Sequence, residues 1–258
     1  MNETQPRIYL LAKPQLDWEA VDSYLADIGG KGWSDRLHGN APDAEALIEF
    51  AGRLCYRSWE PGLNPNVQRV RRDRRAYVDN LLSSGHGSVL EHAQYSFLFR
   101  DVSRVFTHEL VRHRAGVAIS QESLRYVRLT SIGFRVPEVL RPVRAEVVTL
   151  VEALEDFQRS AAQKLGLTAT EVPFAVKKEV TSALRRLAPL GLSTSILWSA
   201  NVRTIRHVIE MRTDPGAEEE MRYVFDTVAT MMLGECPLLF SDYTREATGQ
   251  WRSEHLKV

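Results

Sequence analysis

A segment from Arg112 to Tyr126 gathers side chains that bind anions. It reads RHRAGVAISQESLRY and places four guanidinium or imidazole groups beside hydroxyl-bearing residues, between two apolar runs. Arginine offers a rigid fork of N–H donors that matches phosphate, and serine hydroxyls or backbone N–H groups complete such a cradle. A solvated surface run would normally mix charges of both signs. The segment therefore predicts a binding site for a phosphate-bearing ligand.

The overall charge indicates that this ligand is small. The 258 residues contain 33 Lys+Arg and 33 Asp+Glu, so the net charge is zero, and the arginines cluster locally at 69–75 and 112–125. A protein that binds a polynucleotide by neutralising phosphates is usually basic overall or carries a basic domain. The sequence therefore predicts a small anionic ligand and no nucleic-acid polymer as the partner.

The cysteine content and the hydropathy predict a cytoplasmic protein. Cys55 and Cys236 lie far apart and have no partner motif, which is typical of a reducing compartment. The N-terminal residues lack the basic start and apolar core of a signal peptide. No apolar run approaches the roughly 20 residues that a membrane span needs. We therefore expect no membrane partner.

The patterning predicts one mixed α/β (α+β) domain over 1–258, rich in helix around a central mixed sheet, with a possible helical excursion at 140–170. No repeat, low-complexity segment or Pro/Gly/Ser-rich linker divides the chain. Strands are expected over 7–11 and 95–100, with extended chain at 124–129 and 133–136. Helices are expected over 44–54, 72–84, 105–112, 138–165, 171–187, 200–212 and 218–233.

The Arg-His-Arg triplet followed by Ser-x-Arg-Tyr resembles the signature of the flavin-dependent thymidylate synthases. The resemblance covers roughly residues 45–240 and implies that Arg112, His113 and Arg114 contact the flavin. It also implies that Ser123 and Arg125 contact the uridylate phosphate. The family usually has seven residues between the triplet and the serine, whereas this chain has the eight residues 115–122.

Two further segments carry the resemblance. His86-Gly-Ser88-Val-Leu-Glu91-His92 is similar to a family segment that precedes the central strand. This similarity implies that His86 and Ser88 lie near the flavin and nucleotide, while Glu91 and His92 orient one another. The alternative for this segment is a plain turn before a strand. The resemblance also implies that Arg185, at the end of a helix, binds the nucleotide phosphate. Ser182 stands where the family often has a carboxylate.

The segment from Asn201 to Arg212 gives the other strong match. The resemblance implies flavin contacts for Asn201, Arg203 and His207, and places Arg212 at the uracil ring as a catalytic and substrate-binding residue. At 100° per residue the polar side chains fall on both sides of a helix, which favours an element wedged between subunits. The alternative is a surface helix with ion pairs such as Arg206 with Glu210.

Glu109 departs from the family, which commonly has glutamine there close to the nucleotide. A carboxylate repels a phosphate unless an arginine neutralises it. Glu109 would instead accept a hydrogen bond from a ribose hydroxyl or a protonated group.

Two other chemistries are rejected. His108 and His113 are five residues apart, about 140° around a helix, so they do not match the zinc pattern His-Glu-x-x-His, and no metal site is predicted. Neither Cys236, in an apolar tail, nor Cys55 is predicted to act as the thiolate of the other thymidylate synthase.

The resemblance implies C5-methylation of a uridine monophosphate. FAD would be the cofactor, NADPH and methylenetetrahydrofolate the co-substrates, and the enzyme a homotetramer with active sites at subunit interfaces. Strict use of dUMP and dual use of dUMP and UMP are both open. Relatives in polyoxin-type nucleoside-antibiotic biosynthesis methylate both nucleotides, and the longer spacer could admit a 2′-hydroxyl. A non-catalytic flavin- or nucleotide-binding paralogue is the alternative from a different functional class.

Overall fold

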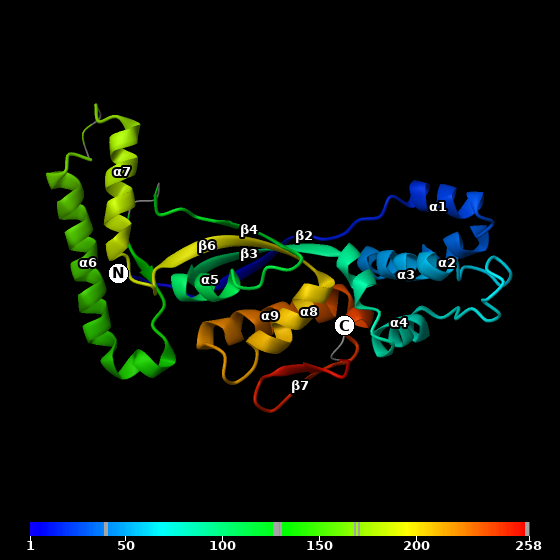
Figure 1. Cartoon of the computed structure of the whole chain (residues 1–258). Helices are drawn as coiled ribbons and strands as arrows, with labels where there is room; N and C mark the ends of the chain where they lie inside the picture. The colour runs from blue at the N-terminus through cyan, green and yellow to red at the C-terminus, as the bar shows by residue number, and fades with distance from the viewer. Residues whose placement is uncertain (39–40, 126–128, 130, 168, 170, 256–257) are drawn as a thin grey trace. The chain divides into compact units, whose positions relative to one another are not determined.

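The computed structural model describes residues 1–258 except 39–40, 126–128, 130, 168, 170 and 256–257. It is a mixed α/β structure, as predicted (Figure 1). The chain forms two compact units, of which the first comprises Met1–Tyr9, Phe97–Arg114 and Ala118–Trp198, and the second Leu10–Ser96, Ala115–Val117 and Ser199–Val258. None of the described helices is long and apolar enough to cross a membrane.

The strands are β1 Asn2–Glu3, β2 Arg7–Ala12, β3 Gln94–Ser103, β4 Val117–Gln121, β5 Gly133–Phe134, β6 Ser193–Asn201, β7 Tyr243–Arg245 and β8 Trp251–Ser253. The α-helices are α1 Trp18–Asp27, α2 Ser34–Leu37, α3 Asp43–Tyr56, α4 Arg74–Ser83, α5 Arg104–Leu110, α6 Arg144–Lys164, α7 Phe174–Leu184, α8 Val202–Arg212 and α9 Glu219–Glu235. The 3₁₀ helices are η1 Lys31–Trp33, η2 Gly87–His92, η3 Glu138–Val143, η4 Arg185–Leu187 and η5 Pro237–Phe240.

The main sheet has the strand order β2-β3-β6-β4, so strands distant in sequence are neighbours. Burial alternates along β3 and β6, as expected for strands with one face against a core. Two small sheets complete the strands. In one, β1 pairs parallel to β5, and in the other β7 and β8 form an antiparallel pair.

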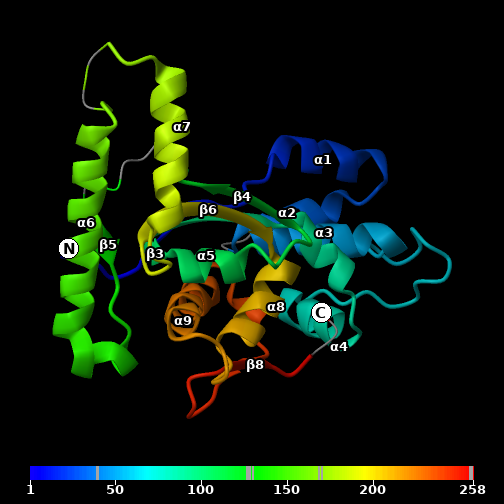
Figure 2. The same ribbon diagram turned by 60° about the vertical axis from the view of Figure 1, so that its left-hand side comes forward.

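Aromatic side chains form the core of the first unit. Phe97 and Phe99, two residues apart and therefore on one face of β3, both pack against Trp198 of β6 at ring-centroid distances of 6.2 and 6.0 Å. Phe106 of α5 meets Phe99 edge to face at 5.4 Å. Helices α6 and α7 run side by side in Figures 1 and 2, and Gln158 donates a hydrogen bond to the carbonyl of Leu184 between them.

The second unit has a separate core, formed by α1, η1, α3 and the segment that follows α3. Trp33, Trp59 and Phe50 form an aromatic cluster, with centroid distances of 6.4 Å between the two indoles and 5.0 Å from Phe50 to Trp59. Arg53 is fully buried there and pairs with Glu49 one helical turn away (Nη2 to Oε1, 2.7 Å). A charge in such surroundings is tolerated because it is both paired and hydrogen-bonded.

Several predicted elements differ from the observed ones. Residues 124–125 form a turn and 126–128 lie outside the described residues, so the extended chain expected at 124–129 is wrong where it can be compared. The extended segment of this region is β4, inside the spacer. The helix expected from residue 200 begins at Val202, because β6 continues to Asn201. The sequence analysis missed β6 and α1.

Candidate functional site

In the second unit the segments containing residues 86–92 and 201–207 come together. His86 precedes η2, and its ring stacks on Tyr56 at the end of α3, with centroids 5.9 Å apart and planes 21° apart. Arg203 of α8 donates to Glu91 (Nη1 to Oε1, 2.6 Å). A Cβ on Gly87 would lie 2.8 Å from Arg203 Nε, so a side chain at this position would displace the Arg203 guanidinium. We expected Glu91 and His92 to orient one another, but Glu91 pairs with Arg203 instead.

Residues 115 and 116, directly after the Arg-His-Arg triplet, contact the start of α8. Asn201 caps this helix, because its side-chain oxygen accepts from the Thr204 amide at 2.8 Å. The Asn201 amide donates to the Gly116 carbonyl (3.2 Å), and the Thr204 hydroxyl donates to the Ala115 carbonyl (2.8 Å). Gly116 has φ +67°, and a Cβ there would lie 2.2 Å from Asn201 Nδ2. The second unit thus joins His86, Asn201 and Arg203 to the loop at 115–117.

The triplet itself lies in the first unit, just beyond α5. The helix ends at Leu110, and the amides of Arg112 and His113 donate to the carbonyls of Glu109 and Leu110 in its last turn. Arg112 and Arg114 are exposed and His113 is half-buried. Glu109 is half-buried on α5. His113 lies outside the helix that carries His108, so the two imidazoles are not on a shared helical face.

A cavity of about 680 Å³ in the first unit brings Arg125 together with Arg185. Lys178 and Arg186 line the same cavity, so four cations face one acidic side chain, that of Glu179. Ser123 holds the turn before Arg125, because its hydroxyl accepts from the Arg125 amide at 3.3 Å. Arg185 is placed by the end of α7. Such a cavity selects an anion, and phosphate matches the arginine forks best.

A family model described as "Thymidylate synthase complementing protein" matches residues 36–238. The chain belongs to this family.

Relatives named flavin-dependent thymidylate synthase align over most of the chain. The protein of Mycobacteroides abscessus is 32% identical over 249 residues, covering 92% of this chain and 89% of the relative. That of Mycobacterium marinum is 34% identical, with 94% and 92% covered. That of Mycobacterium tuberculosis is 32% identical over 209 residues, with 79% and 81% covered. The predicted resemblance and the predicted enzyme class, a methyltransferase of this type, are confirmed at the level of the family.

Arg104 is a further candidate site residue, which was not predicted from the sequence. It opens α5, donates from Nη2 to the Glu122 carbonyl (2.9 Å), and interacts electrostatically with Arg185. Burial, and to a lesser extent Arg185, lower the pKa of its guanidinium, while Glu122 opposes them. Its buried Nε has no acceptor among the described residues. A cation at the first position of a helix opposes the helix dipole, and this mismatch was the available signal.

Glu122, the last residue of the long spacer, is tied to β6. Its amide donates to the Ser195 carbonyl (3.0 Å), and its carboxylate accepts from the Ser195 amide (3.1 Å). Five of the eight spacer residues form β4. The spacer is therefore mostly a strand of the main sheet that ends on a residue bonded to Arg104.

Helix α8 buries a single face, so the expectation of a helix polar on both sides is wrong. Val202, Ile205, Val208 and Ile209 are buried, while Arg203 and His207 are exposed. Arg206 is also buried, and its Nη1 and Nη2 donate to the two carboxylate oxygens of Asp242, both at 2.8 Å. The suggested pair of Arg206 with Glu210 is therefore wrong.

The remaining candidates occupy different surroundings. Arg212 is the last residue of α8 and is half-buried, and Ser88 is exposed on η2. Cys236 is fully buried, and burial raises the pKa of its thiol to about 12, which disfavours a thiolate. Cys55 is exposed. Its sulfur lies 3.4 Å from the Ala51 carbonyl, one helical turn back.

Proposed function

We propose that this protein methylates C5 of a uridine monophosphate, with FAD as cofactor and NADPH and methylenetetrahydrofolate as co-substrates. The observation that carries the proposal is the cavity of the first unit, where Glu179 is the one acidic side chain among the described lining residues and faces Arg125, Arg185, Arg186 and Lys178. It stands in a chain whose relatives are named flavin-dependent thymidylate synthase. A nucleoside monophosphate supplies the dianion that these four cations would hold.

In this proposal the nucleotide phosphate is held by Arg125 and Arg185, with the Ser123 hydroxyl as a further donor. Arg104 adds a partly buried donor near Arg185, and its buried Nε would gain an acceptor from a phosphate oxygen. Satisfying a buried donor contributes more than making a hydrogen bond in water, because the unmatched group otherwise costs about 1–3 kcal/mol. Glu109 would accept from a ribose hydroxyl.

The proposed flavin contacts fit a flavin dinucleotide in their chemistry. Arg112, Arg114 and Arg203 supply N–H donors and positive charge for a pyrophosphate. Gly87 and Gly116 keep the backbone free of side chains beside Arg203 and Asn201. The half-exposed ring of Tyr56, stacked on His86, offers an aromatic face. His113, Ser88, Asn201 and His207 are the remaining proposed flavin contacts.

The bound flavin would supply the reducing equivalents and the folate the one-carbon unit. The task of the protein's own residues is then to orient the uracil and to stabilise the negative charge that develops on its carbonyl oxygens. Arg212 is the residue we propose for this electrostatic role. A guanidinium suits it because it stays protonated at any physiological pH and donates in a fixed plane.

The test is a spectrum followed by an assay. Purified protein should show a flavin absorption spectrum at near-stoichiometric occupancy, and should oxidise NADPH in the presence of methylenetetrahydrofolate and dUMP. If the purified protein cannot be loaded with FAD, the proposed enzymatic activity is refuted. A yellow protein that binds uridylate without oxidising NADPH would support the non-catalytic paralogue.

The sugar specificity and the assembly need separate measurements. Parallel steady-state assays with dUMP and UMP decide between strict and dual use, since no turnover of UMP at saturation excludes the dual-substrate enzyme. We also propose a cytoplasmic homotetramer with active sites at subunit interfaces. Sedimentation equilibrium tests the tetramer, and mixing two singly inactive variants, Arg212→Ala and Arg185→Ala, tests whether different subunits complete one site.

A further inference from the structure

The proposed function does not use the arginine-rich run at 69–75, although part of that run lines a cavity. This cavity lies in the second unit and has a volume of about 360 Å³. Arg72, Arg74 and Arg75 line it together with Arg36 of α2, and Trp33 and Leu238 contribute its apolar surface. The volume suits a small molecule and excludes a folded polymer.

The acidic groups of this cavity are already neutralised or engaged. Glu49 is buried and bonds two arginines, Arg53 at 2.7 Å and Arg74 at 2.6 Å. Asp73 caps α4 by accepting from the Ala76 amide at 2.8 Å. By contrast, Arg36, Arg72 and Arg75 form no ion pair with any described residue. The cavity therefore carries excess positive charge.

Two further donors point to an anion. Arg74 and Arg75 begin α4, a ten-residue helix whose N-terminal amides favour negative charge. Trp33 is 1% exposed, and its indole Nε1 has no acceptor among the described residues. A buried N–H without an acceptor is costly, so a bound anion that accepts from it would be stabilised.

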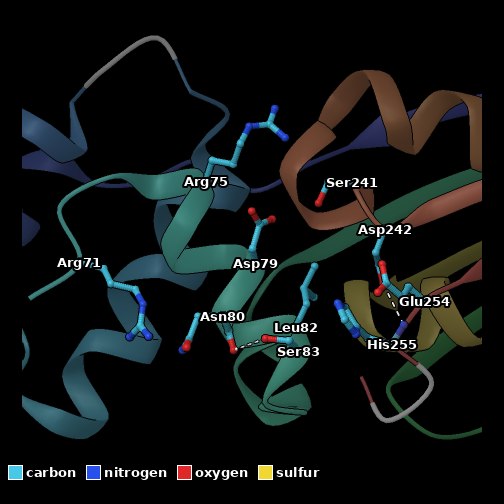
Figure 3. A pocket seen from close by; sticks show the side chains of 10 residues that line it. All are labelled: Arg71, Arg75, Asp79, Asn80, Leu82, Ser83, Ser241, Asp242, Glu254 and His255. Carbon is cyan, nitrogen blue, oxygen red and sulfur yellow. Dashed lines mark hydrogen bonds between the residues drawn. The ribbon is translucent and has the colours of Figure 1, made fainter.

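The adjoining cavity, of about 520 Å³, does not share this selectivity. Arg71 and Arg75 line it, but so do Asp79, Asp242 and Glu254. Figure 3 shows the Arg75 side chain extending away from Asp79. Asp242 is already paired with Arg206, but Asp79 and Glu254 also line this space and repel anions. The predicted anion site is therefore restricted to the cavity beside Trp33.

We propose that the cavity lined by Trp33, Arg36, Arg72 and Arg75 is a second anion site, which binds a small phosphate-bearing molecule. Phosphate is favoured because three forked guanidinium groups and an indole N–H supply more donors than one carboxylate can accept. The site is separate from the uridylate cavity and goes beyond the proposed function.

The test uses inorganic pyrophosphate and isothermal titration calorimetry. Because the uridylate cavity also binds phosphate in the proposed function, and the proposed flavin contacts also bind a pyrophosphate, the measurement is made on FAD-loaded protein in an Arg185→Ala/Arg186→Ala background. Pyrophosphate should still bind this background with micromolar to millimolar affinity. Adding Arg72→Ala and Arg75→Ala should weaken binding at least about tenfold, since each arginine makes a charge-assisted contact. Trp33→Phe, which keeps the ring and removes the donor, should weaken it about threefold.

Arg69→Ala is the matched control, because Arg69 belongs to the same run but lines neither cavity. It should leave the affinity unchanged. The exposed positions of Arg72 and Arg75 make misfolding an inadequate explanation of a loss, and circular dichroism verifies this. No pyrophosphate binding in the background variant, or equal binding after Arg72 and Arg75 are removed, overturns the proposal. Equally tight binding of glutarate would overturn the assignment to phosphate.

Discussion

Replacing Gly116 by alanine should weaken the junction between the loop after the Arg-His-Arg triplet and α8. Gly116 has φ +67°, and a left-handed backbone costs an L-residue about 1–2 kcal/mol. The added Cβ would also lie 2.2 Å from Asn201 Nδ2 and 2.8 Å from Thr204 Oγ1. If Asn201 moves away, α8 loses its N-cap, which is worth about 1 kcal/mol. The total loss of unfolding free energy is about 2–3 kcal/mol.

The chain offers a matched control for the backbone contribution. Gly166 has φ +70°, yet a Cβ there meets nothing within 4 Å. Gly166→Ala should therefore cost only about 1–2 kcal/mol, the strain of the left-handed backbone. Urea unfolding of both variants measures the difference, which we expect to be at least about 1 kcal/mol.

A double variant separates the clash from other effects. Asn201→Ser retains a side-chain oxygen that caps the helix but removes Nδ2, so it should recover about 1 kcal/mol of the loss in the Gly116→Ala background. Flavin affinity should fall in Gly116→Ala and not in Gly166→Ala. Equal destabilisation by the two glycine substitutions, with no rescue by Asn201→Ser, would refute the reasoning.

The other predictions concern buried and ligand-facing charges. Asp242→Asn leaves the buried charge of Arg206 uncompensated and should cost about 3–5 kcal/mol in urea unfolding; a loss below about 1 kcal/mol would contradict a buried pair. Burial raises the pKa of Cys236 from 9.0 to about 12 and that of Tyr77 from 10.0 to about 12. These groups ionise at a lower pH in the unfolded chain than in the folded one, so their contribution to stability should be constant below about pH 8.5 and be lost as the pH rises from 9 towards 12. Below pH 8.5 a thiol reagent should label about one cysteine, Cys55, in native protein. Arg104→Gln should raise the KM for uridylate about tenfold at similar kcat, because a phosphate donor is lost; an unchanged KM excludes Arg104 from the site. Arg203→Ala should change stability by less than about 1 kcal/mol, since its pair with Glu91 is half-exposed, and yet lower flavin affinity in a fluorescence titration.

Helices and strands were predicted best from the sequence where their apolar residues repeat with one clear period. β3 was found because apolar residues alternate in YSFLFR, and α9 because its apolar positions repeat with helical spacing. β6 was missed although Thr194, Ile196, Trp198 and Ala200 alternate in the same way. Ser195 and Ser199 between them, and Asn201 after them, resemble loop residues, and Asn201 serves both as strand end and as helix cap. The partner strand that makes this polarity acceptable is distant in sequence.

Arg203 and Arg206 show why motif letters alone do not define a site. They are three residues apart on α8. From the sequence alone, either arginine could bind a ligand or form a surface ion pair. Burial distinguishes them, because Arg206 is 1% exposed and committed to Asp242, with the Tyr243 ring 4.7 Å from its guanidinium carbon. Arg203 is 45% exposed and shares its donors with Glu91 alone among the ion pairs of the described residues. A ligand can displace an exposed pair at little cost, whereas breaking the Arg206 pair would strand a charge in the core. Substitution of Arg203 should therefore be read as a test of flavin binding, and substitution of Arg206 as a test of folding.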